Sequence, residues 1–142
     1  MVDNPAESAG SRGRIFWLGW VLCGLAIAFL LLDAAMKLLT LPNVLEAGSA
    51  LGFEGKPVER LLGGILLVCT LLYAMPRTAV LGAILLMAYL GGAVAVHLRV
   101  GSPLFSHTLF GVYLGAVIWG GLYLRDNRLR RLLPFIRTQA TS

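Results

Sequence analysis

The stretch His97-Leu-Arg-Val-Gly-Ser-Pro-Leu-Phe-Ser-His107 separates two apolar runs, each long enough to cross a bilayer. It contains both histidines of the chain. Gly101 is typical of a helix end, and Ser102-Pro103 is typical of a helix start. The stretch therefore predicts two antiparallel helices that meet at a compact polar turn.

Four apolar runs make up most of the 142 residues, at residues 15–32, 58–75, 77–97 and 104–124. Hydrophobic residues are 58% of the chain and charged residues 13%, well outside the range of soluble globular proteins. Each run is close to the ~20 residues that a spanning helix needs. We predict an all-α fold, an antiparallel four-helix transmembrane bundle at residues 15–134. A disordered N-terminus at residues 1–14 precedes it, and a flexible tail at residues 135–142 follows.

A short helix is expected between the first two spans. The sequence Thr40-Leu-Pro-Asn43 breaks the first helix, and residues 44–51 have apolar positions at helical spacing. This segment is too short to span, so we expect it to lie across the outer mouth of the bundle, with Asn43 as its N-cap. Pro57 suits the start of the next helix, and Glu59 suits its first turn, where we expect a capping role.

The distribution of lysine and arginine predicts the orientation. One face of the expected bundle carries eight of these residues and the other face carries four, Lys37, Lys56, Arg60 and Arg99. Because cytoplasmic loops carry the excess of positive charge, both termini are predicted to be cytoplasmic. The net charge of +5 then reflects topology and contact with anionic membrane lipid, and no nucleic acid is expected as a partner.

The cysteines give no redox motif. Cys23 and Cys69 lie inside the first and second spans, and the chain has no C-x-x-C pair. Both are expected to be buried packing thiols, which argues against dithiol-disulfide exchange with a quinone.

Polar residues gather at the outer end of the expected bundle. Asp33 and Lys37 are spaced i, i+4, so they can form a solvated ion pair, or Asp33 can face the bundle interior instead. His97, Arg99 and His107 reach the same end from the third and fourth spans. We predict that Asp33, His97, Arg99 and His107 form one coupled site, in which Arg99 holds Asp33 through a bidentate contact.

The ligand of this polar site is left open by the residue types. One Asp with two His resembles part of a metal-ligand set, but the spacing is not specific and no metal is expected. Arg99 with Lys37 can bind an anionic head group. Tyr89 and Tyr113, which lie deeper along the third and fourth spans, are packing residues or the lining of a cleft for a quinone or a lipid head.

Three segments resemble the DoxX-like family of bacterial membrane proteins. They are Asp-Ala-Ala-Met-Lys-Leu from Asp33, Leu-Leu-Gly-Gly from Leu61, and the stretch from His97 to His107. The resemblance covers roughly residues 15–134. It implies a four-helix bundle in the bacterial inner membrane and, through distant relation to DoxX and DoxD, a place in quinone-linked sulfur oxidation. Other distant relatives are thought to act as cargo or assembly factors.

Two classes of function follow from these observations. One is an accessory membrane protein that binds a lipid, a small ligand, a membrane protein partner or a second copy of itself. The other is a quinone-linked redox subunit. The absence of a strong cofactor motif favours the accessory class, and the sequence leaves open whether the chain is an enzyme.

Overall fold

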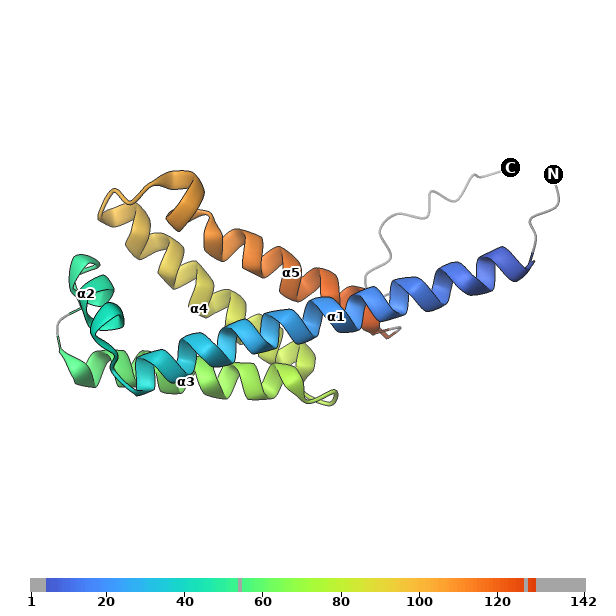
Figure 1. Ribbon diagram of the computed structural model, residues 1–142, viewed down its shortest axis with the longest axis horizontal. Helices are drawn as coiled ribbons and strands as arrows, with labels where there is room; N and C mark the ends of the chain where they lie inside the picture. Colours follow the sequence, from blue (N-terminus) through green and yellow to red (C-terminus); the bar gives the residue numbers. More distant parts are fainter. Residues whose placement is uncertain (1–4, 54, 127, 130–142) are drawn as a thin grey trace.

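The computed structural model describes residues 5–53, 55–126 and 128–129, which form helices and short connections (Figure 1). The helices in chain order are α1 (Pro5–Leu38), α2 (Pro42–Ala50), α3 (Lys56–Ala74), α4 (Ala79–Arg99) and α5 (Phe110–Arg125), with a π-helical turn η1 (Leu104–Thr108) before α5. This confirms the predicted all-α class and the short helix between the first two long ones.

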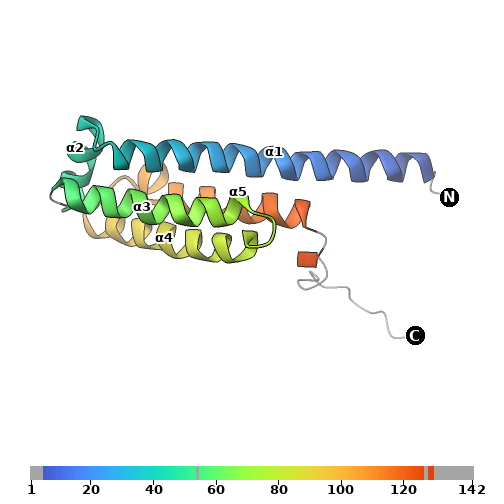
Figure 2. The same cartoon turned by 90° about the horizontal axis from the view of Figure 1, so that it is seen from below.

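The four long helices form a closed ring. Helix α1 packs against α3 and α5, and α4 packs against the other side of the same two helices. Neighbours in the ring run antiparallel, so the first turns of α1 and the end of α5 lie at one end (Figures 1 and 2). We call the opposite end the α2 end.

Four helical segments of the described residues are long and apolar enough to span a membrane, the last of them made of η1 and α5 together. These segments are Phe16–Leu38, Lys56–Ala74, Ala79–Arg99 and Leu104–Arg125. Large apolar side chains such as Trp17 and Phe105 are more than two thirds exposed, as expected of a surface that faces lipid rather than water. The chain is therefore a small multi-pass membrane protein.

Helix α1 is longer than expected at both ends. It begins at Pro5 rather than Ile15, so residues 5–14, for which disorder was predicted, are helical. Proline suits the first turn of a helix, which is consistent with a start at Pro5. The helix also continues past Leu32, because Asp33 and Lys37 pair along one face. The predicted tail at residues 135–142 lies outside the described residues.

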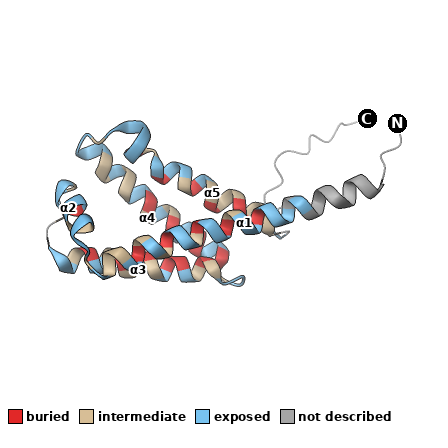
Figure 3. Ribbon diagram, viewed as in Figure 1, coloured by how far each residue is buried: buried red, intermediate tan, exposed pale blue. Residues whose placement is uncertain are grey.

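Burial is uneven along the bundle. The buried residues of α4 are Ala79, Gly82, Ala83, Leu86 and Leu90, and its last two turns, which the structure describes in full, contain none (Figure 3). At the tightly packed end, the Tyr73 hydroxyl donates to the carbonyl oxygen of Ile118 at 2.9 Å and lies 3.1 Å from Cys23 Sγ. Cys23 and Cys69 are buried free thiols, as predicted. The helices therefore pack closely near the termini and leave space at the α2 end.

Candidate functional site

A cavity of about 770 Å³ lies at the α2 end, between the four long helices and under α2. We call it the α2 cavity. Its walls are mostly apolar, and its volume falls in the ~300–1,000 Å³ range of ligand pockets. The ionisable and polar residues among its lining are Asp33, Lys37, Asn43, Glu59, Tyr89, His97, His107 and Thr108.

Asp33 is paired with Lys37 and not with Arg99. The Lys37 Nζ donates to Asp33 Oδ1 at 2.6 Å, one helical turn away on α1. Arg99 is exposed, is not part of the cavity lining, and donates to the carbonyl oxygen of Leu51 at 3.3 Å. The predicted contact between Asp33 and Arg99 is therefore absent from the described structure. Lys37 pairs with Asp33 because both residues lie on the same face of α1. Arg99 cannot compete, because the end of α4 faces the connection after α2.

The two histidines meet at the mouth of the α2 cavity, with ring centroids 6.1 Å apart. Gly101 has a φ of 69°, which lets the chain turn sharply after α4 and brings His107 back toward His97. His97 Nδ1 lies 3.0 Å from Ser102 Oγ, and His107 Nδ1 lies 2.7 Å from Ser106 Oγ. Each ring is thus held by a serine of the same turn.

Asn43 does not cap α2. The N-cap is Leu41, which makes no side-chain capping bond, and Asn43 lies inside the helix and lines the cavity. Pro42 is the reason, because its fixed φ suits the first helical turn and moves the start of α2 ahead of Asn43.

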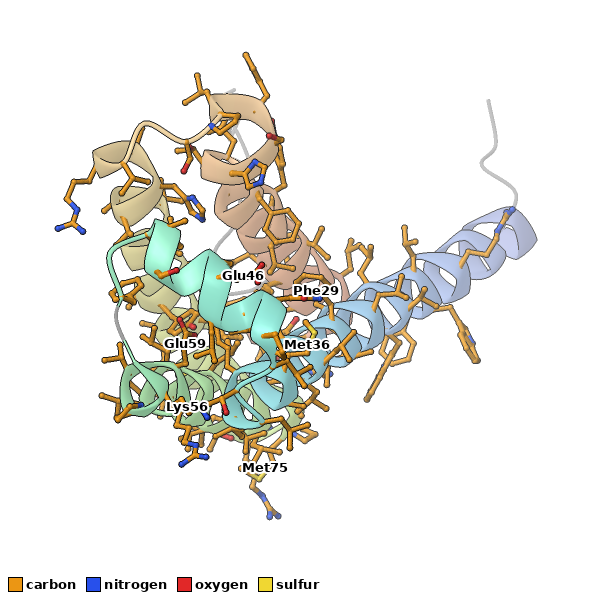
Figure 4. All side chains as sticks on the ribbon, turned by 60° about the vertical axis from the view of Figure 1, so that its left-hand side comes forward. Phe29, Met36, Glu46, Lys56, Glu59 and Met75 are labelled. Carbon is orange, nitrogen blue, oxygen red and sulfur yellow. The ribbon has the colours of Figure 1, made fainter. Side chains whose placement is uncertain are left out.

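Glu59 lines the cavity, although the sequence predicted only a capping role for it. It lies in the first turn of α3, as expected, but its side chain is only 3% exposed and lines the cavity. Figure 4 looks onto α2, with Glu59 close to it and Phe29 and Met36 on the α1 side. The signal was present in the sequence: Glu59, Gly63 and Leu66 follow helical spacing and share the buried face of α3.

Residues 21–121 match the DoxX-like family. The chain belongs to the DoxX-like family. The matched region contains every polar residue of the α2 cavity. Comparisons with curated proteins and with solved structures found no match. Membership accounts for the membrane bundle, and the role of this DoxX-like protein must be argued from its cavity.

The two tyrosines that were predicted to line a cleft, Tyr89 and Tyr113, point in different directions in this DoxX-like protein. Tyr89 is partly buried and lines the cavity, as the sequence suggested. Tyr113 is 51% exposed and lies outside the cavity lining. Gly111, Gly115 and Ile118 form the buried face of α5, so a residue two positions after Gly111 must face away from the bundle.

The charges that line the cavity do not balance. Lys37 neutralises Asp33, which leaves the carboxyl group of Glu59 as the excess acid among the described lining residues. Within the same described part of the DoxX-like protein, no group of three His, Cys, Asp or Glu side chains is placed to hold a metal ion. The arrangement is suited to a molecule with an apolar body and a polar head.

Proposed function

We propose that this protein is an accessory component of the bacterial inner membrane that holds an amphipathic molecule, such as a membrane lipid, in the α2 cavity. The cavity itself carries the proposal, because about 770 Å³ of mostly apolar space inside a membrane bundle takes up a chain-bearing molecule. Leu30, Leu62, Leu66 and Leu114 would surround the chain, and the polar lining would meet the head.

A quinone is the alternative occupant, in keeping with the relation to DoxX and DoxD. Tyr89 supports it, because its hydroxyl makes no hydrogen bond within the described residues and can donate to a quinone carbonyl. In that case the protein would position the quinone for a partner that carries the redox centre.

The cavity would open toward the outer face of the membrane. Lys and Arg are in excess at the end that holds both termini, eight against four, which favours that end as cytoplasmic. Trp20 and Arg125 support this placement, since the guanidinium carbon lies 4.7 Å from the Trp20 ring, in the manner of an interfacial belt.

Photolabelling of the purified protein in mild detergent tests the proposal. The probe is a long-chain alcohol with a diazirine in its chain, and mass spectrometry of the peptides reports where it attaches. We expect attachment at the inward residues Leu62, Leu66 and Leu114 in addition to lipid-facing positions. A competing ubiquinone analogue with a ten-carbon tail shows whether a quinone takes the same space.

Two adjacent glycines of α4 provide a matched pair of variants. Gly92 lines the α2 cavity, Gly91 lines a separate groove between α4 and α5, and neither has a neighbour within 4 Å of an added Cβ. Gly92→Phe should reduce inward labelling about tenfold, which corresponds to ~1.4 kcal/mol of binding free energy. Gly91→Phe should leave it unchanged. Equal labelling in both variants would contradict the proposal.

A further inference from the structure

Glu59 is a buried residue whose carboxyl group has no partner among the residues that the structure describes. Its side chain is 3% exposed, and within the described residues it makes no hydrogen bond or ion pair. Taking a carboxylate out of water without a compensating partner is strongly unfavourable, so buried acids are normally found paired. Since Glu59 lines the α2 cavity, the missing partner can come from whatever the cavity holds.

The packing around Glu59 keeps its carboxyl group inside. Gly48 of α2 lies directly against Glu59 Oε1, at the point where any Cβ would stand. Gly48 is itself buried, so α2 covers the acid from the outer side. Gly63 lies one turn further along the same face of α3, where a Cβ added to it would stand 2.8 Å from Lys37 Cβ, so α3 and α1 are in close contact there.

The positively charged residues nearby are committed elsewhere or face outward. Lys37 is bound to Asp33, and Arg99, which does not line the cavity, is bound to the Leu51 carbonyl oxygen. Lys56 and Arg60, which flank Glu59 on α3, are exposed and do not line the cavity. His97 and His107 lie at the mouth, and each holds a serine through Nδ1. Among the Asp, Glu, Lys and Arg side chains of the described lining, two acids, Asp33 and Glu59, therefore face one base, Lys37.

We infer that Glu59 is the head-group receptor of the α2 cavity and that its ligand carries a protonated primary amine on an apolar chain. This inference rests on the proposed function and adds the chemical class of the ligand. An ammonium group donates three hydrogen bonds and cancels the charge of Glu59. A neutral head, such as an alcohol or a quinone, leaves that charge uncompensated. A free alkylamine and an aminolipid share this chemistry.

Competition against the diazirine alcohol tests the inference on the intact protein in non-ionic detergent. The competitors are dodecylammonium, dodecanol and dodecanoate, which share a chain and differ in head-group charge. We expect dodecylammonium to displace the probe at about tenfold lower concentration than dodecanol, a difference of ~1.4 kcal/mol. Dodecanoate should be the weakest of the three. This order needs no variant, so it holds even if a substitution impairs folding.

A matched pair of acids identifies the receptor. Glu59→Gln should abolish the preference for the amine while dodecanol still competes. Glu46→Gln removes an exposed acid of α2 that does not line the cavity, and it should keep the preference (Figure 4). Equal competition by amine and alcohol in the natural protein, or a preference that survives Glu59→Gln, would overturn the inference. Failure of dodecanol to compete at all would instead overturn the proposed function.

A final competitor distinguishes the two sources of the amine. Lysophosphatidylethanolamine carries the same primary amine behind a phosphate. If it displaces the probe as well as dodecylammonium does, the amine class is supported and the source is an aminolipid. If only dodecylammonium displaces the probe, the amine class is equally supported and the source is a free alkylamine.

Discussion

Gly48 has no side chain at the point where α2 meets the carboxyl group of Glu59. A Cβ added to Gly48 would meet the end of the flexible Glu59 side chain. The carboxyl group can therefore move aside while α2 stays in place. Moving a side chain away from its preferred rotamer costs about 1 kcal/mol. The contact therefore sets the position of the acid more than it sets the stability of the fold.

We expect Gly48→Ala to leave the unfolding midpoint in detergent nearly unchanged and to reduce the preference for an ammonium head group. Competition by dodecylammonium against dodecanol measures the preference, and thermal unfolding measures the stability. In a Glu59→Ala background, where no carboxyl group is left to displace, the same substitution should change neither. A large loss of stability in Gly48→Ala alone would mean that α2 moves instead.

Local spacing predicted some of these contacts and missed others. Asp33 and Lys37 are one helical turn apart on a single helix, so their ion pair could be predicted from their spacing in the sequence. The pairing of Asp33 with Arg99 required the end of α4 to face α1, and the chain turns it toward Leu51. Glu59 was assigned a capping role because it stands at the edge of an apolar run. Its burial depends on α2, which covers it from another part of the chain.

At the scale of elements, a glycine lies at each of the four contacts between long helices. The pairs are Gly63 with Lys37 between α3 and α1, Gly121 with Cys23 between α5 and α1, Gly82 with Tyr73 between α4 and α3, and Gly111 with Val94 between α5 and α4. Small residues let helix backbones approach closely in a membrane, where burial of apolar surface gives no advantage over lipid. The glycine pattern in the sequence indicated such packing without showing which helix each glycine meets.

Gly82→Ala should destabilise the bundle, because the added Cβ meets the backbone of Tyr73, which cannot rotate away. We expect a loss of about 1–3 kcal/mol, as for other overpacked sites. Gly91→Ala is the control on the same helix, since its Cβ meets nothing within 4 Å and alanine favours the helix. Equilibrium unfolding in mixed micelles measures both. Similar stability of the two variants would show that α3 and α4 are not in close contact.

The π-helical turn η1 was not predicted. An ordinary first turn of the last helix was expected from Ser102-Pro103, but the backbone nitrogen of Thr108 bonds the carbonyl oxygen of Pro103 and that of Leu109 bonds the carbonyl oxygen of Leu104. Each bond spans one residue more than in an α-helix. The amino-acid types of this stretch do not indicate a π-helical turn. The turn places His107 at the cavity mouth beside His97.

For the whole molecule, the decisive question is which side of the membrane the α2 end faces. Single cysteines at Ser49 on α2 and at Ser8 near the start of α1 can be tested with a membrane-impermeant maleimide, because the two natural cysteines are buried. In intact cells stripped of their outer membrane, Ser49→Cys should react at once and Ser8→Cys only after permeabilisation. The opposite result would reverse the orientation, and reaction of both from one side would contradict the four spans.

The four spans, their antiparallel order and the position of the short helix were all predictable from the sequence, because apolar run length and chain breaks set them. The cavity was not, since it depends on how far neighbouring helices separate toward the α2 end. That separation depends on contacts between residues distant in the sequence, such as Tyr73 and Ile118. A local sequence pattern therefore does not predict it.

The hydrogen bond between the Tyr73 hydroxyl and the Ile118 carbonyl oxygen bears on the geometry of the cavity. It joins α3 to α5 in the closely packed half, and the nine residues of α5 from Ile118 back to Phe110 extend about 12 Å from it toward the cavity mouth. A change in the tilt of α5 about this bond would move its cavity end in proportion to that distance. The volume of the cavity would then depend on the angle of this helix as well as on the size of the side chains that line it.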